Sequence, residues 1–264
     1  MCQLLGMNCN VPTDICFSFE GFSRRGGETD EHKDGWGVSF FEGKGCRTFM
    51  DINPSAESVV SELVKHYPIK SLNVIAHIRK ASVGAITLEN THPFVRELWG
   101  EYWVFAHNGD LIDFQPELSG CFLPVGSTDS ELAFCSILET LKCRFSEKPG
   151  LDQLYAALCR EARNISAYGI FNFLISNGEF MFAHCSNNLY YLVRSHPFSE
   201  AQLKDLDMTV DFQAVTNKKD RVAVIATQPL TVNEEWTRLA EGQCCLFSEG
   251  KILADSEEVA LPGK

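Results

Sequence analysis

Short apolar runs separated by turn residues dominate the hydrophobic pattern of this chain. The runs are rich in Val, Ile, Phe and Leu, which is typical of buried β-strands. The runs that predict strands are residues 36–41, 72–78, 102–106, 170–175, 180–184, 189–193, 222–226, 244–247 and 251–254. Asn177-Gly178 and residues 248–250 fall between neighbouring runs, and both favour hairpin turns.

Other segments show the spacing of amphipathic helices instead. Residues 54–67 carry apolar side chains three and four positions apart, with a proline near the start. Residues 151–163 predict another helix, and Thr128 with Glu131 forms the capping-box pattern ahead of a third. The apolar positions of the first helix are Val59, Val60, Leu63 and Val64. The glycine-rich and charged residues 20–37 predict a long loop.

The order of these elements is strands, then helices, then strands. This order predicts an α+β fold in which helices cover layered sheets. The chain has 264 residues, 45% of them apolar, and 19 phenylalanines, which is enough for a sizeable core. It contains no internal repeat, low-complexity tract or long linker, so we expect a single domain over residues 1–264.

The net charge of −12 at pH 7 disfavours binding to nucleic acid or an anionic membrane through bulk charge. The eleven cysteines are odd in number, scattered, and without the spacing of zinc ligands, so we expect free thiols and no metal. Cys244 and Cys245 are adjacent in a predicted strand and should point to opposite faces. Because neither a secretory signal nor a membrane span is found, the sequence predicts a cytoplasmic protein.

Cys2 is the first candidate for chemistry. It follows Met1 directly, so removal of one residue gives a cysteine with a free α-amine. A thiol attacks only as its thiolate. An α-amine titrates near ~8 and can take the thiol proton near neutral pH. A cysteine at this position carries little meaning alone, and three later segments change its interpretation.

These segments place polar residues at the ends of predicted strands and at the start of a helix. They are residues 77–84 (HIRKASVG), 106–109 (AHNG) and 127–131 (STDSE). Each has an ordinary structural explanation: a strand-end arginine as a surface charge, Asn-Gly as a turn, and aspartate in the first turn of a helix. Residues 91–93 (THP) lie between the first two segments.

Together with Cys2, these segments resemble the motifs of the type II, or N-terminal nucleophile, glutamine amidotransferases, in the same order. The motifs cover roughly the first 140 residues. Residues 34–37 (DGWG) are similar to those of the short, stand-alone bacterial members of the YafJ type. The resemblance implies a four-layer αββα sandwich of the N-terminal nucleophile hydrolase type.

The resemblance also implies a role for each residue. Cys2 is the nucleophile, and Asn108 and Gly109 form the oxyanion hole. Arg79 binds the α-carboxylate of glutamine, and Asp129 binds its α-ammonium. These residue types suit the reaction, because a zwitterion needs one cation and one anion and a developing oxyanion needs two aimed donors.

The implied reaction is hydrolysis of the glutamine side-chain amide through a cysteine thioester, with release of ammonia and no cofactor. An ammonia-accepting synthase is the implied partner. His92 either contacts the substrate pocket or packs ahead of Pro93. Two alternatives stay open: an amidohydrolase for a γ-glutamyl amide of a larger amine, since only the glutamyl head is recognised, and a catalytically silent glutamine-binding module. The presence of Cys2 together with oxyanion donors argues against the silent module.

Overall fold

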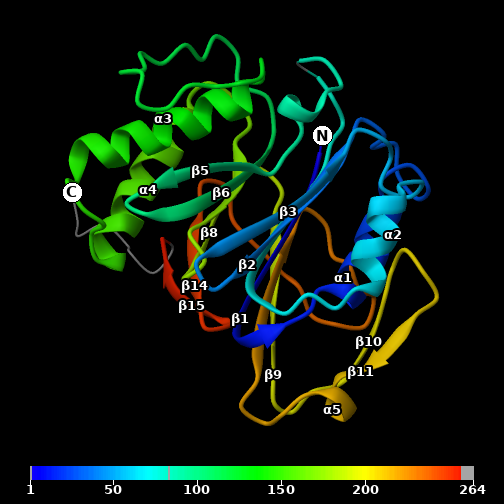
Figure 1. The fold of residues 1–264 in the computed structure, drawn as a ribbon. Coiled ribbons are helices and arrows are strands. Elements are labelled where there is room, and N and C mark those ends of the chain that lie inside the picture. Colours follow the sequence, from blue (N-terminus) through cyan, green and yellow to red (C-terminus); the bar gives the residue numbers. More distant parts are fainter. Residues whose placement is uncertain (1, 83, 257–264) are drawn as a thin grey trace.

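Two antiparallel sheets lie face to face at the centre of the molecule (Figure 1). The computed structural model describes residues 2–82 and 84–256. The strands of the larger sheet are β1 (Gln3–Thr13), β2 (Trp36–Glu42), β3 (Gly45–Asp51), β4 (Ser71–Ile78), β9 (Tyr190–Ser195), β12 (Arg221–Ala226) and β13 (Thr237–Arg238). They are arranged in the order β13-β9-β12-β1-β4-β2-β3, so β1 is the central strand.

The smaller sheet has six strands in the described residues. They are β5 (Phe94–Leu98), β6 (Glu101–Asn108), β7 (Asn172–Ser176), β8 (Met181–His184), β14 (Cys244–Ser248) and β15 (Lys251–Asp255), in the order β15-β14-β8-β7-β6-β5. A short pair, β10 (Glu200–Gln202) and β11 (Thr209–Asp211), forms a separate ribbon. The helices are α1 (Cys16–Arg24), α2 (Val59–His66), α3 (Asp129–Arg144), α4 (Leu151–Ser166) and α5 (Phe212–Val215), with a 3-10 turn at Leu88–Asn90.

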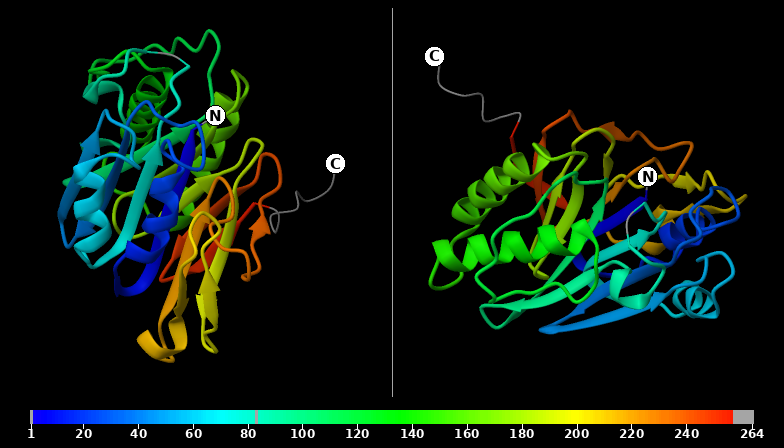
Figure 2. Two further views of the ribbon diagram at one scale, coloured as in Figure 1. Left: turned by 90° about the vertical axis from the view of Figure 1, so that its right-hand side faces the viewer. Right: turned by 90° about the horizontal axis from the view of Figure 1, so that it is seen from above.

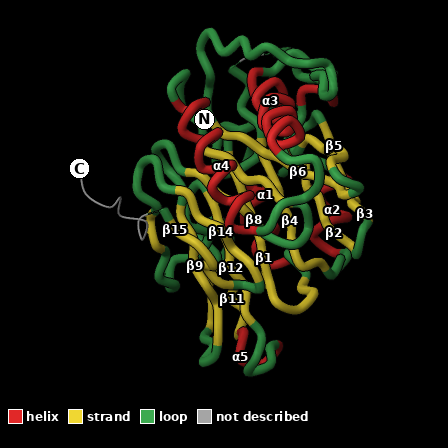
Figure 3. The backbone as a smooth tube through the Cα atoms, turned by 90° about the vertical axis from the view of Figure 1, so that its left-hand side faces the viewer, coloured by secondary structure: helices red, strands yellow, loops and turns green. Residues whose placement is uncertain are grey.

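Three apolar clusters separate four layers (Figures 1 and 2). One cluster lies between the two sheets and includes Leu4 and Leu174. Another packs α1 and α2 on the larger sheet, where Phe19 lies against Trp36. The last packs α3 and α4 on the smaller sheet. Figure 1 shows the strands of both sheets between α3 and α4 on one side and α1 and α2 on the other, which confirms the predicted αββα arrangement. Figure 3 shows the same layers from the side of α3 and α4.

The period of two residues along the strands decides which cluster each side chain joins. Leu4 points into the space between the sheets, and Leu5 points toward α1 and α2. Likewise Cys244 faces the helices and Cys245 faces the opposite sheet, as predicted. Gly6 permits the close approach of the sheets, because a Cβ there would lie 2.9 Å from a Leu174 methyl carbon.

All nine predicted strands are confirmed, with ends that shift by two residues at most, and both predicted hairpin turns join paired strands. The predicted helix at 151–163 extends to Ser166. The hydrophobic pattern does not predict β1, because Gly6, Asn8 and Asn10 interrupt its apolar residues. The structure buries Asn8 by pairing its side chain with that of Asn73 on β4, at 2.8 Å.

One loop prediction and one helix prediction need correction. The loop predicted over 20–37 begins only after α1, whose Phe19 and Phe22 are fully buried and hold the segment helical despite Gly21. Helix α2 covers only part of 54–67, and the predicted apolar stripe is partly wrong. Val64 is buried, but Val59 is 83% exposed, because the short helix lies at the edge of the larger sheet.

Thr128 caps α3 as the sequence predicts: its hydroxyl accepts the main-chain N–H of Glu131. The carboxylate of Glu131 does not return to Thr128, however. It accepts the N–H of Gly126 at 2.7 Å and pairs with Arg96 on β5. The start of α3 is therefore tied both to the preceding loop and to the smaller sheet.

Candidate active site

The start of β1 lies between the ends of its two neighbours. Both β4 and β12 run antiparallel to β1, so the last residues of these strands meet its first residues. Gln3 pairs with Ile78, and the main-chain N–H of Thr227 donates to Leu4 O at 3.1 Å. Cys2, directly ahead of β1, therefore lies between Arg79 on one side and the segment after Thr227 on the other.

The thiol of Cys2 contacts the main chain of Lys80. The Lys80 N–H donates to Sγ at 3.3 Å, and Sγ lies 3.4 Å from Lys80 O. Burial raises the pKa of the Cys2 thiol to about 11, and the N–H of Lys80 opposes that rise. The thiol is consequently neutral at pH 7 and needs a base to become a nucleophile. Met1 lies outside the described residues.

Arg79 is buried directly after β4, and both its main chain and its guanidinium form hydrogen bonds. Its main-chain N–H donates to Gly35 O, and its oxygen accepts the N–H of Asp34. The Asp34 carboxylate accepts from Ala81 N at 2.7 Å, which fixes the chain beyond the strand. The guanidinium donates to the main-chain oxygens of Gly84 and Ala85, at 3.2 and 3.0 Å. Two uncharged main-chain oxygens thus orient the guanidinium of Arg79. A carboxylate would bind this cation more strongly than these oxygens do.

Asn108 and Gly109 lie at the end of β6, in the opposite sheet. Asn108 is fully buried, and its Nδ2 lies 3.4 Å from Thr227 Oγ1, so this side chain bridges to the larger sheet. Gly109 packs tightly against the chain ahead of β7. A Cβ at Gly109 would lie 1.7 Å from Ile170 O, so no other residue fits this main-chain path.

Asp129 occupies the first turn of α3, where its carboxylate accepts two main-chain N–H groups. These come from Leu111 at 2.7 Å and Ser130 at 2.8 Å. The N–H of Leu111 belongs to the loop that continues from Gly109. Asp129 therefore joins the helix start to the end of β6, in line with the favourable position of an anion at a helix N-terminus.

His107 connects these two parts of the site. Its Nε2 lies 3.0 Å from Ile170 O, which can only accept, so Nε2 carries the proton. Nδ1 then accepts from the hydroxyl of Ser130, at 2.8 Å. Burial lowers the pKa of His107, while the charge of Asp129 opposes that shift. The neutral ring holds the Ile170 oxygen against Gly109 and fixes the residue next to Asp129.

His92 is buried behind these residues. Its ring lies 4.2 Å from that of His77 and 4.4 Å from that of Phe94, measured between ring centres. Neither ring nitrogen has a hydrogen-bond partner among the described residues, and burial lowers its pKa well below the usual value. His92 thus packs as a neutral ring beside β4, the strand directly ahead of Arg79, and its contact with substrate stays a prediction.

The residues that the sequence does not single out are the ones that position the others. Ser130, Thr227 and Asp34 hold Asp129, Asn108 and the Arg79 segment, respectively. Ser130 and Asp34 fall inside segments chosen for their neighbours. Thr227 has no local signal beyond a polar side chain after a buried strand, so only the packing of the sheets places it here.

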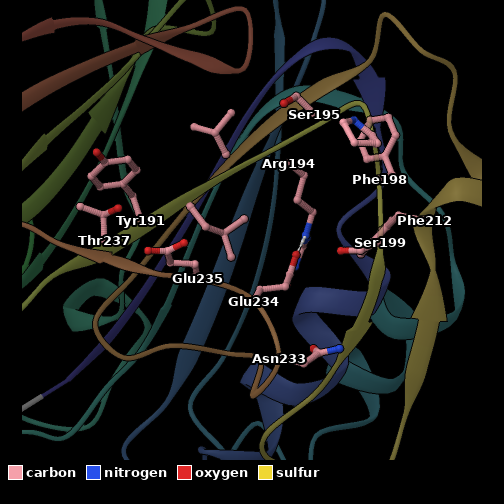
Figure 4. Close-up of a pocket in the computed structure, with 13 residues that line it drawn as sticks. Tyr191, Arg194, Ser195, Phe198, Ser199, Phe212, Asn233, Glu234, Glu235 and Thr237 are labelled. Atoms are coloured by element: carbon pink, nitrogen blue, oxygen red, sulfur yellow. Dashed lines mark hydrogen bonds and ion pairs between the residues drawn. The ribbon is translucent and has the colours of Figure 1, made fainter.

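A hollow lies on another part of the larger sheet, along β9 (Figure 4). Its volume is about 580 Å³, and its centre holds Arg194 in a two-point ion pair with Glu234, with both distances 2.7 Å. Arg194 on β9 pairs with Val222 on β12, and Val222 pairs with Cys9 on β1. Cys9 lies seven residues along the chain from Cys2. That spacing is about 23 Å. The hollow is therefore separate from the Cys2 site, and its central cation is already neutralised.

Comparison with known proteins agrees with the fold and identifies the family. Residues 1–261 match the family described as glutamine amidotransferases class-II. A provisionally named glutamine amidotransferase of Haemophilus influenzae is 51% identical over 256 residues, covering 97% of this chain and 87% of that one. YafJ of Escherichia coli, also provisionally named a glutamine amidotransferase, is 51% identical over 252 residues, covering 95% and 99%.

Solved structures show the same fold. The crystal structure of a predicted glutamine amidotransferase from Pseudomonas aeruginosa superimposes with a TM-score of 0.77 at 45% identity, covering 96% of this chain and 99% of that one. The glutamine phosphoribosylpyrophosphate amidotransferase of B. subtilis has a TM-score of 0.58 at 14% identity, covering 96% and 48%. The second likeness concerns the fold alone.

The chain belongs to the class-II glutamine amidotransferase family, and its fold is the αββα sandwich of the N-terminal nucleophile hydrolases. Within residues 2–82 and 84–256, each helix is too short or too polar to cross a bilayer.

Proposed function

We propose that this protein hydrolyses the side-chain amide of glutamine with Cys2 as the nucleophile. The observation that carries the proposal is the convergence of three strand ends. The start of β1 brings Cys2 beside Arg79 and Lys80 at the end of β4, and Asn108 at the end of β6 reaches Thr227 beside β1. The sulfur attacks the amide carbon, ammonia leaves, and water hydrolyses the resulting γ-glutamyl thioester.

The base in this mechanism is the α-amine of Cys2 after Met1 is removed. The thiol pKa of about 11 lies well above neutral pH, so few molecules carry a thiolate without help. An α-amine titrates near ~8 and is attached to the same residue. It takes the thiol proton and then delivers a proton to the departing ammonia.

The oxyanion is stabilised by the side-chain amide of Asn108 and the main-chain N–H of Gly109. Substrate recognition divides between the two charges of the amino acid head. Arg79 binds the α-carboxylate, and Asp129 binds the α-ammonium. Both charged groups are already oriented by main-chain partners, so little order has to be created when the substrate arrives.

The fate of the ammonia, the cellular compartment and a second substrate are also part of the proposal. If a synthase binds at the site, it receives the ammonia; otherwise the ammonia is released into solvent. The cysteines of residues 2–82 and 84–256 form no disulfide with one another, which supports action in the cytoplasm. A γ-glutamyl amide of a larger amine is the second substrate candidate, because the head-group contacts constrain only the glutamyl part.

The test uses Met1-free protein and measures ammonia or amine release from glutamine and a panel of γ-glutamyl amides. Cys2→Ala should abolish release and also block labelling by a glutamine-like diazoketone. Cys16→Ala is the matched control, since Cys16 is likewise partly exposed and its thiol pKa is also raised to about 11. Labelling that persists in Cys2→Ala, or that is lost in Cys16→Ala, would remove Cys2 from its role.

A further inference from the structure

The side-chain amide of Asn108 is unevenly satisfied. Its Nδ2 lies 3.4 Å from Thr227 Oγ1, a long contact, and its Oδ1 is buried without a donor among the described residues. A buried amide oxygen without a donor has lost its hydrogen bonds to water without replacement, which is unfavourable. The two ends of an amide have nearly the same shape, so a half-turn of the group fits the same space.

The hydroxyl of Thr227 has a proton to give. Its oxygen already accepts the main-chain N–H of Leu4, at 2.9 Å. When Asn108 Nδ2 faces Thr227, the hydroxyl oxygen meets a second N–H donor. The proton of the hydroxyl and the Oδ1 of Asn108 then both lack a hydrogen-bond partner within the described part of the chain. With Oδ1 facing it, the hydroxyl donates to that oxygen, and the contact satisfies both groups. The second orientation leaves only the NH₂ group of Asn108 directed away from Thr227.

We propose that Thr227 is a positioning residue of the oxyanion hole: its hydroxyl holds Asn108 Oδ1, so that the NH₂ group of Asn108 faces the amide attacked by Cys2. The inference rests on the proposed function, in which Asn108 donates to the oxyanion. It adds a reason for the direction of that donor, because an amide turned the other way would present a lone pair to a developing negative charge.

The surrounding main chain explains how Thr227 can perform this task. Its N–H donates to Leu4 O at 3.1 Å, and its own oxygen accepts from Asn188 Nδ2 at 2.9 Å. Thr227 is only 3% exposed. The hydroxyl is therefore fixed relative to Leu4, two residues from the nucleophile, and it transmits the position of β1 to a donor on the other sheet.

Kinetics of Thr227→Val and Thr227→Ser test the role. Valine keeps the shape and removes the hydroxyl, and we expect kcat to fall about five- to tenfold with a smaller change in KM. Serine should restore most of kcat. In an Asn108→Ala background, Thr227→Val should have little further effect on kcat. The same fold loss in both backgrounds would overturn the proposal, since Thr227 would then act only through Leu4 and strand pairing.

The orientation itself is measured by neutron diffraction from deuterium-exchanged crystals of the Met1-free protein. We expect Asn108 Oδ1 on the Thr227 side, with both amide deuterons on the other side. Deuterons facing Thr227 would overturn the inference. This measurement needs no turnover: protein that releases nothing from any γ-glutamyl amide would refute the proposed function, while the amide orientation would still decide the place of Thr227.

Discussion

Gly109 lies against the main-chain oxygen of Ile170 so closely that a Cβ at this position would come within 1.7 Å of it. That oxygen also accepts the Nε2–H of His107. Gly109→Ala must therefore move the chain that carries the proposed oxyanion donors. We expect kcat to fall by roughly 10²–10³, as when an oxyanion donor is removed. Gly150→Ala is the control, because a Cβ there meets no atom within 4 Å. Normal turnover in Gly109→Ala would separate this residue from the oxyanion hole.

Asp129 and Arg79 should be distinguishable by the substrate charge that each recognises. Asp129→Asn should raise KM for glutamine about tenfold or more, but should change KM little for an analogue that lacks the α-amine. Arg79→Lys should raise KM for both, because lysine cannot reproduce the two-point contact with the carboxylate. Steady-state kinetics with the two substrates measure this. The control Arg47→Lys alters an exposed ion pair with Glu42 and should change neither KM.

Removal of Met1 should change the pH dependence of the Cys2 thiol. In protein that retains Met1, the neutral thiol is favoured up to a pKa of about 11. Its alkylation by iodoacetamide should be slow at pH 7 and should rise continuously toward pH 11. In processed protein the α-amine takes the proton, so the rise should occur near ~8. Mass spectrometry of the Cys2 peptide gives both rates, and identical profiles would exclude the α-amine as the base.

Glu139 on α3 should contribute stability that depends on pH. Its carboxylate accepts N–H groups from four successive residues of the loop ahead of α3, namely Ser119, Gly120, Cys121 and Phe122. Desolvation raises the pKa of this carboxyl, but hydrogen bonds from Ser119, Phe122 and Gly120 outweigh it, and the pKa is lowered overall. The folded state therefore favours the ionised form, and its stabilisation is full above the unfolded pKa near ~4.3.

Glu139→Gln should accordingly reduce the free energy of unfolding by about 1–3 kcal/mol at pH 7. The difference from the parent protein should shrink as the pH falls below ~4, when the carboxyl becomes protonated. Urea unfolding at the two pH values measures it. Glu147→Gln changes an exposed carboxylate on the same side of the fold and is the control. A difference that grows in acid would contradict the assignment.

The sequence predicts the parts of this protein that depend on local pattern or on recognisable motifs. The buried strands follow from apolar runs, and Thr128 follows from the chemistry of helix caps. The strand that follows Cys2 is not predicted, since Asn8, which interrupts its apolar residues, is buried by pairing with Asn73 on β4. Whether residues 1–264 fold as one domain stays a prediction.

The candidate site divides in the same way. Cys2, Arg79, Asn108 and Asp129 belong to segments with a recognisable composition. Thr227 is found only in the folded molecule, because its relevance comes from a partner 119 residues away in sequence. Hydrogen bonds between distant segments leave no periodic pattern or fixed spacing in the sequence. Residues such as Thr227, which orient other side chains in this way, therefore cannot be predicted from the sequence.

The central position of β1 also determines when the site can exist during synthesis. Cys2 leaves the ribosome long before Thr227 does, and Leu4 is joined to Thr227 across 223 residues. Until β12 inserts beside β1, the nascent chain carries a thiol without an oriented oxyanion donor. Contacts of such high contact order form late and slowly. The proposed amide hydrolysis is therefore coupled to completion of the sandwich, and we expect an unfinished chain to be inactive toward glutamine.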